Sequence, residues 1–315
     1  MGHDSIVTTT FDELLNAYWL RPETALWREL DIRAMQAFEF KSPSLDIGCG
    51  DGLFSFIRAG GRMSETYDAF RSVSNLDDYF KNIDVYDAFE EASSFKVLSR
   101  PNYQINIGFD HKENLLKKTR VLGLYKASKL GDANAPLPFE DNAFNSIFSN
   151  IVYWLDEPSL VIAELGRVLR PGVMVCLLLP NRTFPEYSFY NQLYVKTENP
   201  KWAFLQKLDR GRFSDNIKQS RSAAEWERMF LDAGLRVAEH RRHLSKATIQ
   251  VWDVGLRPLF PLLKKITDAI PPEEFLEIKA EWVDIVRMFL GPLLDLDGEV
   301  DAQSEHAFHC YILEK

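Results

Sequence analysis

A glycine-rich turn directly after a short apolar run constrains the fold of this chain more than any other feature. Residues 44–47 predict a short buried strand, Gly48, Gly50 and Gly52 follow it, and residues 53–59 predict a helix. Side chains at such a turn would block a ligand from the exposed amides of the helix, and glycine removes that obstacle. The segment therefore predicts a ligand-binding turn at the edge of an α/β sheet.

Strands and helices alternate along the rest of the core. Apolar runs predict strands at 105–109, 125–129, 146–149 and 173–179, and amphipathic stretches predict helices at 113–122 and after Pro158. We expect the second helix to end at Pro171-Gly172, with Arg167 and Arg170 in its last turn. This alternation is typical of an α/β fold with a doubly wound, mainly parallel sheet.

The chain is expected to consist of an α/β core with several additions. Residues 44–245 predict the core, and residues 1–43 predict an N-terminal helical cap. Within the core, residues 62–103 have weak periodicity and predict an insertion, whereas the aromatic, irregular stretch 181–220 predicts a lid. Residues 246–315 are expected to form a helical pair before the last strand of the sheet.

Composition and charge exclude several classes of protein. The 315 residues are 46% hydrophobic and 26% charged, which is ordinary for a globular chain and excludes wholesale disorder. The formal net charge of -9 makes nucleic acid and anionic membranes poor partners. Three well-separated cysteines predict a reducing compartment and no metal cluster. Without a signal peptide or an apolar run of about 18 residues, we expect a cytoplasmic protein with no integral membrane segment.

Two aspartates at predicted strand ends complete a candidate ligand site. Asp110 offers two acceptor oxygens, which suit the adjacent hydroxyls of a ribose, and Asp132 can accept from an adenine amino group. Asp68 lies closer to Asp46 in the sequence and is a rival ribose ligand, but Asp110 has the better strand-end position. The glycine spacing departs from that of dinucleotide sites, so a nicotinamide-dependent oxidoreductase is disfavoured but stays an alternative.

The motifs and their order resemble those of class I S-adenosylmethionine-dependent methyltransferases, in particular the group called methyltransferase type 11. The matching segments are 45–52, 107–110, 131–133, 137–139 and 164–172. The resemblance covers roughly residues 44–180 and implies a seven-stranded Rossmann-like methyltransferase sheet with S-adenosylmethionine as cofactor. Asp46 and Asp110 are much farther apart than in the family, so the insertion must leave the sheet undisturbed.

The resemblance also implies roles for individual residues. It assigns the methionine moiety to Asp46 and the glycine loop, the ribose to Asp110 and the adenine to Asp132 with Ala133. The implied cofactor-binding set is Asp46, Gly48, Cys49, Gly50, Asp110, His111, Asp132, Ala133 and Asn150. Asn150 and Tyr153 follow the strand that faces the methyl donor in the family, so they are the candidate catalytic residues, with ordinary loop packing as the alternative.

The expected activity is methyl transfer to a small organic or lipid-like acceptor held by the aromatic lid. A sulfonium already activates its methyl group, so alignment and exclusion of water matter more than an acid–base pair. The alternatives are a catalytically silent cofactor-binding scaffold subunit and a nucleic-acid or protein methyltransferase. Helices over 247–292 carry much apolar surface, for which core packing, a homodimer face and an apolar tunnel or membrane contact all stay open.

Overall fold

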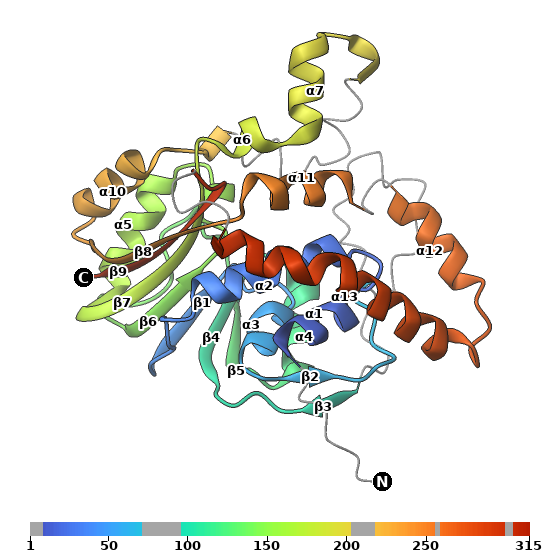
Figure 1. The fold of residues 1–315 in the computed structure, drawn as a ribbon. Coiled ribbons are helices and arrows are strands. Elements are labelled where there is room, and N and C mark those ends of the chain that lie inside the picture. Colours follow the sequence, from blue (N-terminus) through green and yellow to red (C-terminus); the bar gives the residue numbers. More distant parts are fainter. Residues whose placement is uncertain (1–8, 71–95, 203–217, 256–258, 300–304) are drawn as a thin grey trace.

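Seven strands form one sheet in the computed structural model, which describes residues 9–70, 96–202, 218–255, 259–299 and 305–315 (Figure 1). The order across the sheet is β5-β4-β1-β6-β7-β9-β8. The strands are β1 (Ser44–Ile47), β4 (Ile105–Asp110), β5 (Tyr125–Leu130), β6 (Phe144–Ser149), β7 (Leu169–Pro180), β8 (Arg236–His243) and β9 (Phe308–Glu314). The expected seven-stranded α/β sheet is confirmed.

The pairing directions bring the candidate motifs to one edge of this sheet. Strand β1 pairs in parallel with β4 and β6, and β5 and β7 extend the parallel part, whereas β9 runs antiparallel to both β7 and β8. Parallel strands end at the same edge of a sheet. The segments that follow Ile47, Asp110, Leu130 and Ser149 therefore meet there.

Helices cover both faces of the sheet. They are α1 (Thr10–Ala17), α2 (Pro22–Ala34), α3 (Leu53–Arg58), α4 (Glu113–Leu122), η2 (Val152–Trp154), α5 (Pro158–Val168), α6 (Phe184–Tyr187), α7 (Phe189–Thr197), η3 (Pro200–Trp202), α10 (Ala223–Asp232), α11 (Lys246–Val254), α12 (Phe260–Asp268) and α13 (Phe275–Glu299). Helix α13 packs against α1 and α2, and its long ribbon crosses in front of them in Figure 1. The N-terminal and C-terminal additions thus form one helical layer.

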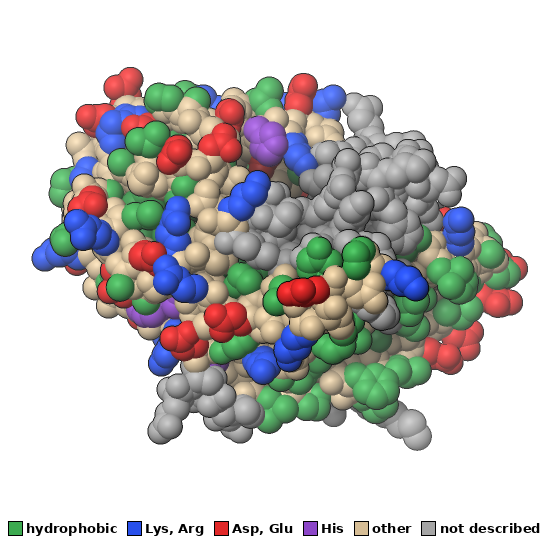
Figure 2. All heavy atoms as spheres, turned by 90° about the horizontal axis from the view of Figure 1, so that it is seen from above, with side chains coloured by type: hydrophobic (Ala, Val, Ile, Leu, Met, Phe, Trp, Pro, Cys, Tyr) green, Lys and Arg blue, Asp and Glu red, His purple; other side chains and the backbone are tan. Residues whose placement is uncertain are grey.

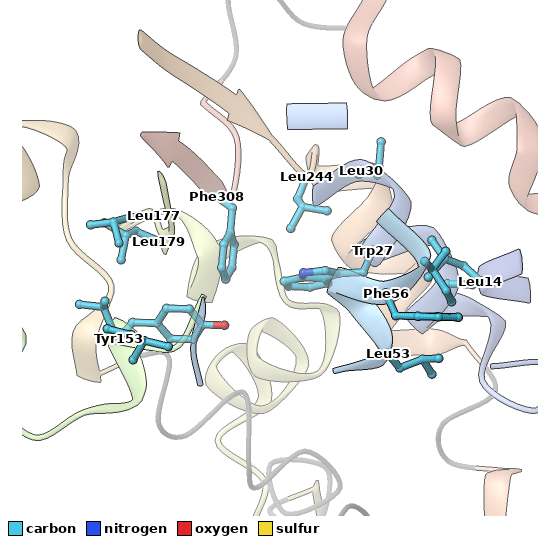
Figure 3. Close-up of a cluster of buried hydrophobic side chains, with 14 of the residues drawn as sticks. Leu14, Trp27, Leu30, Leu53, Phe56, Tyr153, Leu177, Leu179, Leu244 and Phe308 are labelled. Atoms are coloured by element: carbon cyan, nitrogen blue, oxygen red, sulfur yellow. The ribbon is translucent and has the colours of Figure 1, made fainter. Parts of the chain in front are cut away.

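Aromatic rings join this helical layer to the sheet. Trp27 of α2 lies with its ring centroid 5.1 Å from that of Phe308 in β9 and 4.9 Å from that of Trp252 in α11. Phe308 also contacts Tyr153, at 5.7 Å between centroids. Figure 3 shows Tyr153 and Trp27 on either side of Phe308, with aliphatic core side chains around them. The N-terminal helices are therefore held directly beside the segment that follows β6.

The end of the helix after Pro158 differs from the prediction. Helix α5 ends at Val168, and β7 begins at Leu169, so Arg170 lies in a strand rather than in the last helical turn. The cause is Pro171, because a residue that precedes proline is driven out of the helical region. Arg167 does lie in the last turn, as expected.

The additions also contain more regular structure than the sequence patterns indicated. The stretch predicted as an irregular lid holds α6 and α7, although residues 203–217 of it lie outside the described part. Three helices, α11, α12 and α13, take the place of the expected helical pair, because α11 ends at its C-cap Gly255, and Pro271 and Pro272 separate α12 from α13. The described ends of the insertion pair as antiparallel strands β2 (Arg62–Met63) and β3 (Val97–Ser99); residues 71–95 lie outside the description.

Candidate cofactor site

Three left-handed glycines shape the turn between β1 and α3. Gly48, Gly50 and Gly52 have φ values of 74°, 55° and 77°, a region that side-chain-bearing residues rarely adopt. A Cβ atom on Gly48 would lie 2.3 Å from the Ile151 side chain, whereas a Cβ atom on Gly50 would meet no atom within 4 Å. Gly48 is therefore required for packing, and Gly50 presents bare main chain to open space.

Asp110 contacts this turn directly. Its Oδ2 atom accepts a hydrogen bond from the Gly50 backbone N–H at 2.8 Å, and its Oδ1 atom accepts one from Lys112 N at 2.9 Å. Each carboxylate oxygen can accept a further bond, which is what the two hydroxyls of a ribose would require. The His111 ring is exposed, and its Nδ1 atom lies 3.6 Å from Asp110 Oδ1. The strand-end carboxylate and the glycine turn are thus in direct contact.

Asp46 lies beneath the turn instead of at its surface. Only 2% of Asp46 is exposed, and its Oδ2 atom accepts hydrogen bonds from Tyr125 Oη at 2.6 Å and from Ser55 Oγ at 2.7 Å. Burial raises the pKa of Asp46 to about 6, although the hydrogen bonds from Tyr125 and Ser55 act in the opposite direction. In this arrangement Asp46 ties β1, α3 and β5 together under the loop. Its contact with a methionine moiety stays a prediction.

Cys49 is also held within the turn. A Cβ atom on Gly108 of β4 would lie 3.0 Å from Cys49 Sγ, so the close approach of the two strand ends depends on that glycine. Burial raises the pKa of the Cys49 thiol well above its usual value, and the nearby carboxylate of Asp46 acts in the same direction. The thiol is therefore protonated at neutral pH, which favours a packing role over a nucleophilic one.

The predicted adenine-binding residues follow β5. Asp132 is exposed and accepts a hydrogen bond from Asn134 N at 2.9 Å, whereas Ala133 is buried. The Gly131 N–H donates to the Asp110 carbonyl oxygen at 3.0 Å, which joins the two strand ends. Asp132 therefore directly follows a residue that is bonded to Asp110, and its contact with an adenine stays a prediction.

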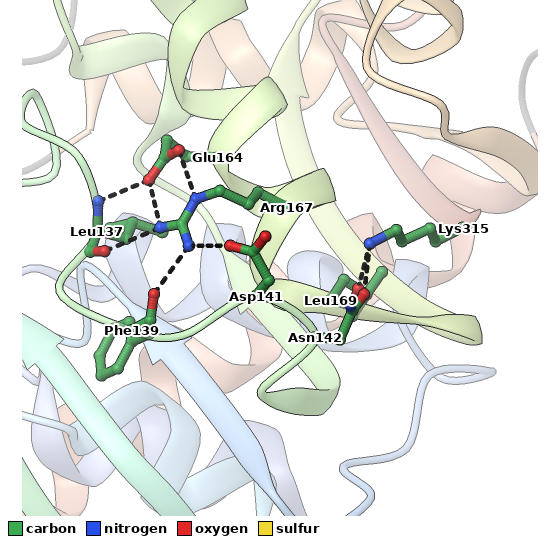
Figure 4. A network of polar contacts seen from close by, with 8 residues as sticks. All are labelled: Leu137, Phe139, Asp141, Asn142, Glu164, Arg167, Leu169 and Lys315. Carbon is green, nitrogen blue, oxygen red and sulfur yellow. Dashed lines mark hydrogen bonds and ion pairs between the residues drawn. The ribbon is translucent and has the colours of Figure 1, made fainter.

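An arginine network holds the segment after Asp132 in place. Arg167 donates through Nε and Nη2 to the two carboxylate oxygens of Glu164 at 2.8 Å, and through Nη1 to Asp141 at 2.7 Å (Figure 4). It also donates to the carbonyl oxygens of Leu137 and Phe139, and hydrogen bonding to Arg167 lowers the pKa of Glu164. The planar guanidinium, with five donors in a rigid fork, suits this task. Sequence reasoning treated Arg167 only as a helix-end cation and missed this role.

The segment after β6 forms the side of the site next to the glycine turn. Ser149 Oγ donates to the Ile47 carbonyl oxygen at 3.1 Å, and Ile151 packs on Gly48. Asn150 between them is partly exposed at the strand end. Tyr153 is 8% exposed within the aromatic cluster. Of the two candidate catalytic residues, Asn150 thus lies partly exposed at the strand end and Tyr153 lies in the interior against Phe308.

Asp68, the rival ribose ligand, lies elsewhere. It accepts a hydrogen bond from Phe70 N at 2.7 Å at the base of the insertion. Burial raises its pKa, and the charges of Lys279 and Lys264 from the C-terminal helices act against that rise. It therefore belongs to the contact between the insertion and the helical layer, while Asp110 is the carboxylate that contacts the glycine turn.

Neither a metal cluster nor a membrane-spanning helix is found in the part of the chain that the structure describes. No group of three or more His, Cys, Asp or Glu side chains in those residues could hold a metal ion. His240 Nε2 lies 2.9 Å from His309 Nδ1, and His243 Nε2 lies 2.9 Å from Asp31 Oδ1. Each of these ring nitrogens therefore has a hydrogen-bond partner within the protein. Among the same residues, no helix has both the length and the hydropathy to cross a bilayer.

A comparison with protein families matches part of the chain. Residues 91–177 match the family model described as a methyltransferase domain. No curated protein sequence matches the chain significantly.

Three solved structures are similar to this one. An S-adenosylmethionine-dependent methyltransferase from Thermotoga maritima, described as a possible histamine N-methyltransferase, is 14% identical over 93% of this chain and 91% of that one, with a TM-score of 0.47. The [4+2]-cyclase SpnF is 15% identical over 95% and 84%, with a TM-score of 0.46. A methyltransferase from Mesorhizobium loti is 11% identical over 90% and 96%, with a TM-score of 0.43.

The methyltransferase-domain match at residues 91–177, the seven-stranded sheet and the glycine turn beside Asp110 are the features expected of a class I S-adenosylmethionine-dependent methyltransferase. A methyltransferase domain of this kind implies S-adenosylmethionine as cofactor. The residues present suit this molecule, because Gly50 leaves open space over bare main chain and Asp110 has acceptor capacity next to it.

Proposed function

We propose that this methyltransferase acts on a small organic or lipid-like acceptor. The observation that carries the proposal is the packing of Ile151 on Gly48, because it seats the segment after β6 on the glycine turn. Two residues further on, Tyr153 joins an aromatic cluster with Phe308 and Trp27. An apolar, aromatic interior next to this segment suits a small molecule, whereas a nucleic acid would require a basic surface.

The proposed roles follow from these positions. Asp110 would accept hydrogen bonds from the ribose hydroxyls, and the main chain at Gly50 would allow close approach of the ligand. Asn150, partly exposed at the end of β6, would orient cofactor or acceptor through its amide, and Tyr153 would line the acceptor side. Bound S-adenosylmethionine supplies an activated methyl group, so these residues need to align the acceptor and exclude water.

Transfer of a labelled methyl group tests this proposal. The purified chain is incubated with S-adenosylmethionine labelled at the methyl group and with separate small-molecule, RNA and protein fractions of a cell extract. Label is expected in the small-molecule fraction with the wild type and at a much lower level with Asp110→Ala. Label confined to RNA or protein would contradict the acceptor class. Cofactor binding without transfer to any fraction would favour the silent scaffold.

A homodimer through the C-terminal helices stays a separate prediction. Hydrophobic side chains gather on one side of the face in Figure 2, and α12 and α13 expose Leu262, Ile266, Ile285, Met288 and Phe289. Light scattering of the wild type and of Phe289→Glu tests the prediction, because an apolar interface would not tolerate a buried carboxylate. A dimer that dissociates in the variant supports it, and a monomeric wild type contradicts it.

A further inference from the structure

A buried ammonium group is bonded to the charged residue of the glycine turn. Lys118 of α4 donates from Nζ to Asp51 Oδ2 at 2.7 Å, and the two side chains are only 8% and 13% exposed. The other oxygen of Asp51 accepts a hydrogen bond from Leu53 N, at 3.0 Å. The Asp51 carboxylate therefore connects α4 to the first turn of α3, within the loop that approaches the cofactor.

The same part of α4 packs against the turn. A Cβ atom on Gly52 would lie 3.3 Å from Thr119 and 3.5 Å from Leu122, so these two side chains contact the main chain there. Thr119 Oγ1 also lies 2.7 Å from Ser128 Oγ in β5, which holds α4 to the sheet. Lys118 reaches Asp51 because α4 is seated in this way. The ion pair therefore belongs to the support of the turn and not to a mobile surface.

A third segment covers the ion pair. The Lys118 Nζ atom lies 5.3 Å from the centroid of the Tyr67 ring, at the base of the insertion. Burial raises the pKa of Tyr67 to about 12, and the Tyr67 carbonyl oxygen accepts a hydrogen bond from Lys279 Nζ at 2.5 Å. An aromatic face over a cation excludes water and strengthens its interactions. The ion pair is thus enclosed by the glycine turn, α4 and the insertion.

We infer that Lys118 is a positioning residue for cofactor binding, which acts through Asp51 to hold the main chain around Gly50 in its binding conformation. The inference rests on the proposed cofactor site. Removal of one partner from a buried ion pair is costly, since the other charge stays buried without compensation. Asp51 would then turn toward water, and the loop main chain that carries it would shift as well.

Calorimetric titration of the full chain with S-adenosylhomocysteine tests the inference. Lys118→Met is expected to raise Kd by about tenfold or more, whereas Lys118→Arg, which keeps the charge, should stay within about threefold of the wild type. In an Asp51→Asn background, Lys118→Met should change Kd by less than about threefold, because the carboxylate on which it acts is gone. Lys117→Met is the matched control, since Lys117 is exposed on the same helix.

The outcomes separate this inference from a general packing role. Equal losses from Lys118→Met in the wild-type and Asp51→Asn backgrounds would overturn it, as would unchanged affinity in Lys118→Met. Circular dichroism and Tm without ligand verify that each variant folds, and Lys118→Gln replaces Lys118→Met if the latter does not. Failure of the wild type to bind S-adenosylhomocysteine would contradict the cofactor site itself, a result distinct from the failure of the variants.

Discussion

Asp46 gives the sharpest prediction about stability, because a carboxylate that is buried beneath the glycine turn favours its neutral form. Its pKa rises from 3.8 to about 6 in the folded protein. A pKa difference of about two units between the folded and unfolded states corresponds to about 3 kcal/mol, since each pKa unit is worth about 1.4 kcal/mol. Between about pH 4 and pH 6, Asp46 therefore keeps a proton in the folded state that it has already released in the unfolded state. This stabilisation is complete below about pH 4 and is lost as the pH rises through about 6.

Asp46→Asn should remove this dependence. The amide oxygen of Asn can still accept hydrogen bonds from Tyr125 and Ser55, but the side chain carries no charge at any pH. The free energy of unfolding of the variant minus that of the wild type should increase by about 3 kcal/mol between about pH 4 and pH 7, with much of the change above pH 5.

Urea unfolding of both proteins at closely spaced pH values measures this difference. The affinity of the Asp46→Asn variant for S-adenosylhomocysteine, measured in a separate titration, reports on whether Asp46 contacts the cofactor. A stability difference that stays constant from about pH 5 to pH 8 would refute the argument from burial. So would a difference that decreases as the pH rises.

Two other predictions concern the glycine turn and the helical layer. Gly50→Ala should weaken binding of S-adenosylhomocysteine by at least about tenfold while costing only about 1–2 kcal/mol of stability, because the new Cβ meets open space in a left-handed residue. Gly48→Ala should destabilise the fold more, through its clash with Ile151; equal Tm values for the two variants would contradict this. Burial lowers the pKa of Lys279 to about 8, so the unfolded state binds more protons between about pH 8 and pH 10. Unfolding experiments should therefore show stability rising by up to about 3 kcal/mol over that range, and no such rise in Lys279→Met.

Local signals explain which elements the sequence could predict. The helix expected over 113–122 has those bounds in the structure, because its amphipathic pattern ends at Gly123, whose φ of 67° suits a helix C-cap. The capped start of α7 carried a signal too, since Ser188 accepts from Asn191 N, yet the aromatic composition concealed it. The position of Asp110 at the end of β4 could be predicted from the apolar run before it.

Contacts between distant segments explain what the sequence could not predict. Asp46 is bonded to Tyr125 and Asp51 to Lys118, and nothing in the spacing of these residues indicates that they meet. Arg167 likewise appeared to be a helix-end charge because its acceptors on residues 137–141 become neighbours only in the folded chain. The candidate ligand-binding residues therefore follow from motifs, whereas the residues that support them follow from tertiary packing.

Titration calorimetry of the wild type and Asp110→Ala with S-adenosylmethionine, S-adenosylhomocysteine and NAD tests the central claim most directly. We expect the wild type to bind the first two and not the third. Asp110→Ala should weaken that binding by about 1–3 kcal/mol, because the ribose loses a charged acceptor next to the glycine turn. Binding of NAD alone, or full affinity for S-adenosylhomocysteine in Asp110→Ala, would contradict the account.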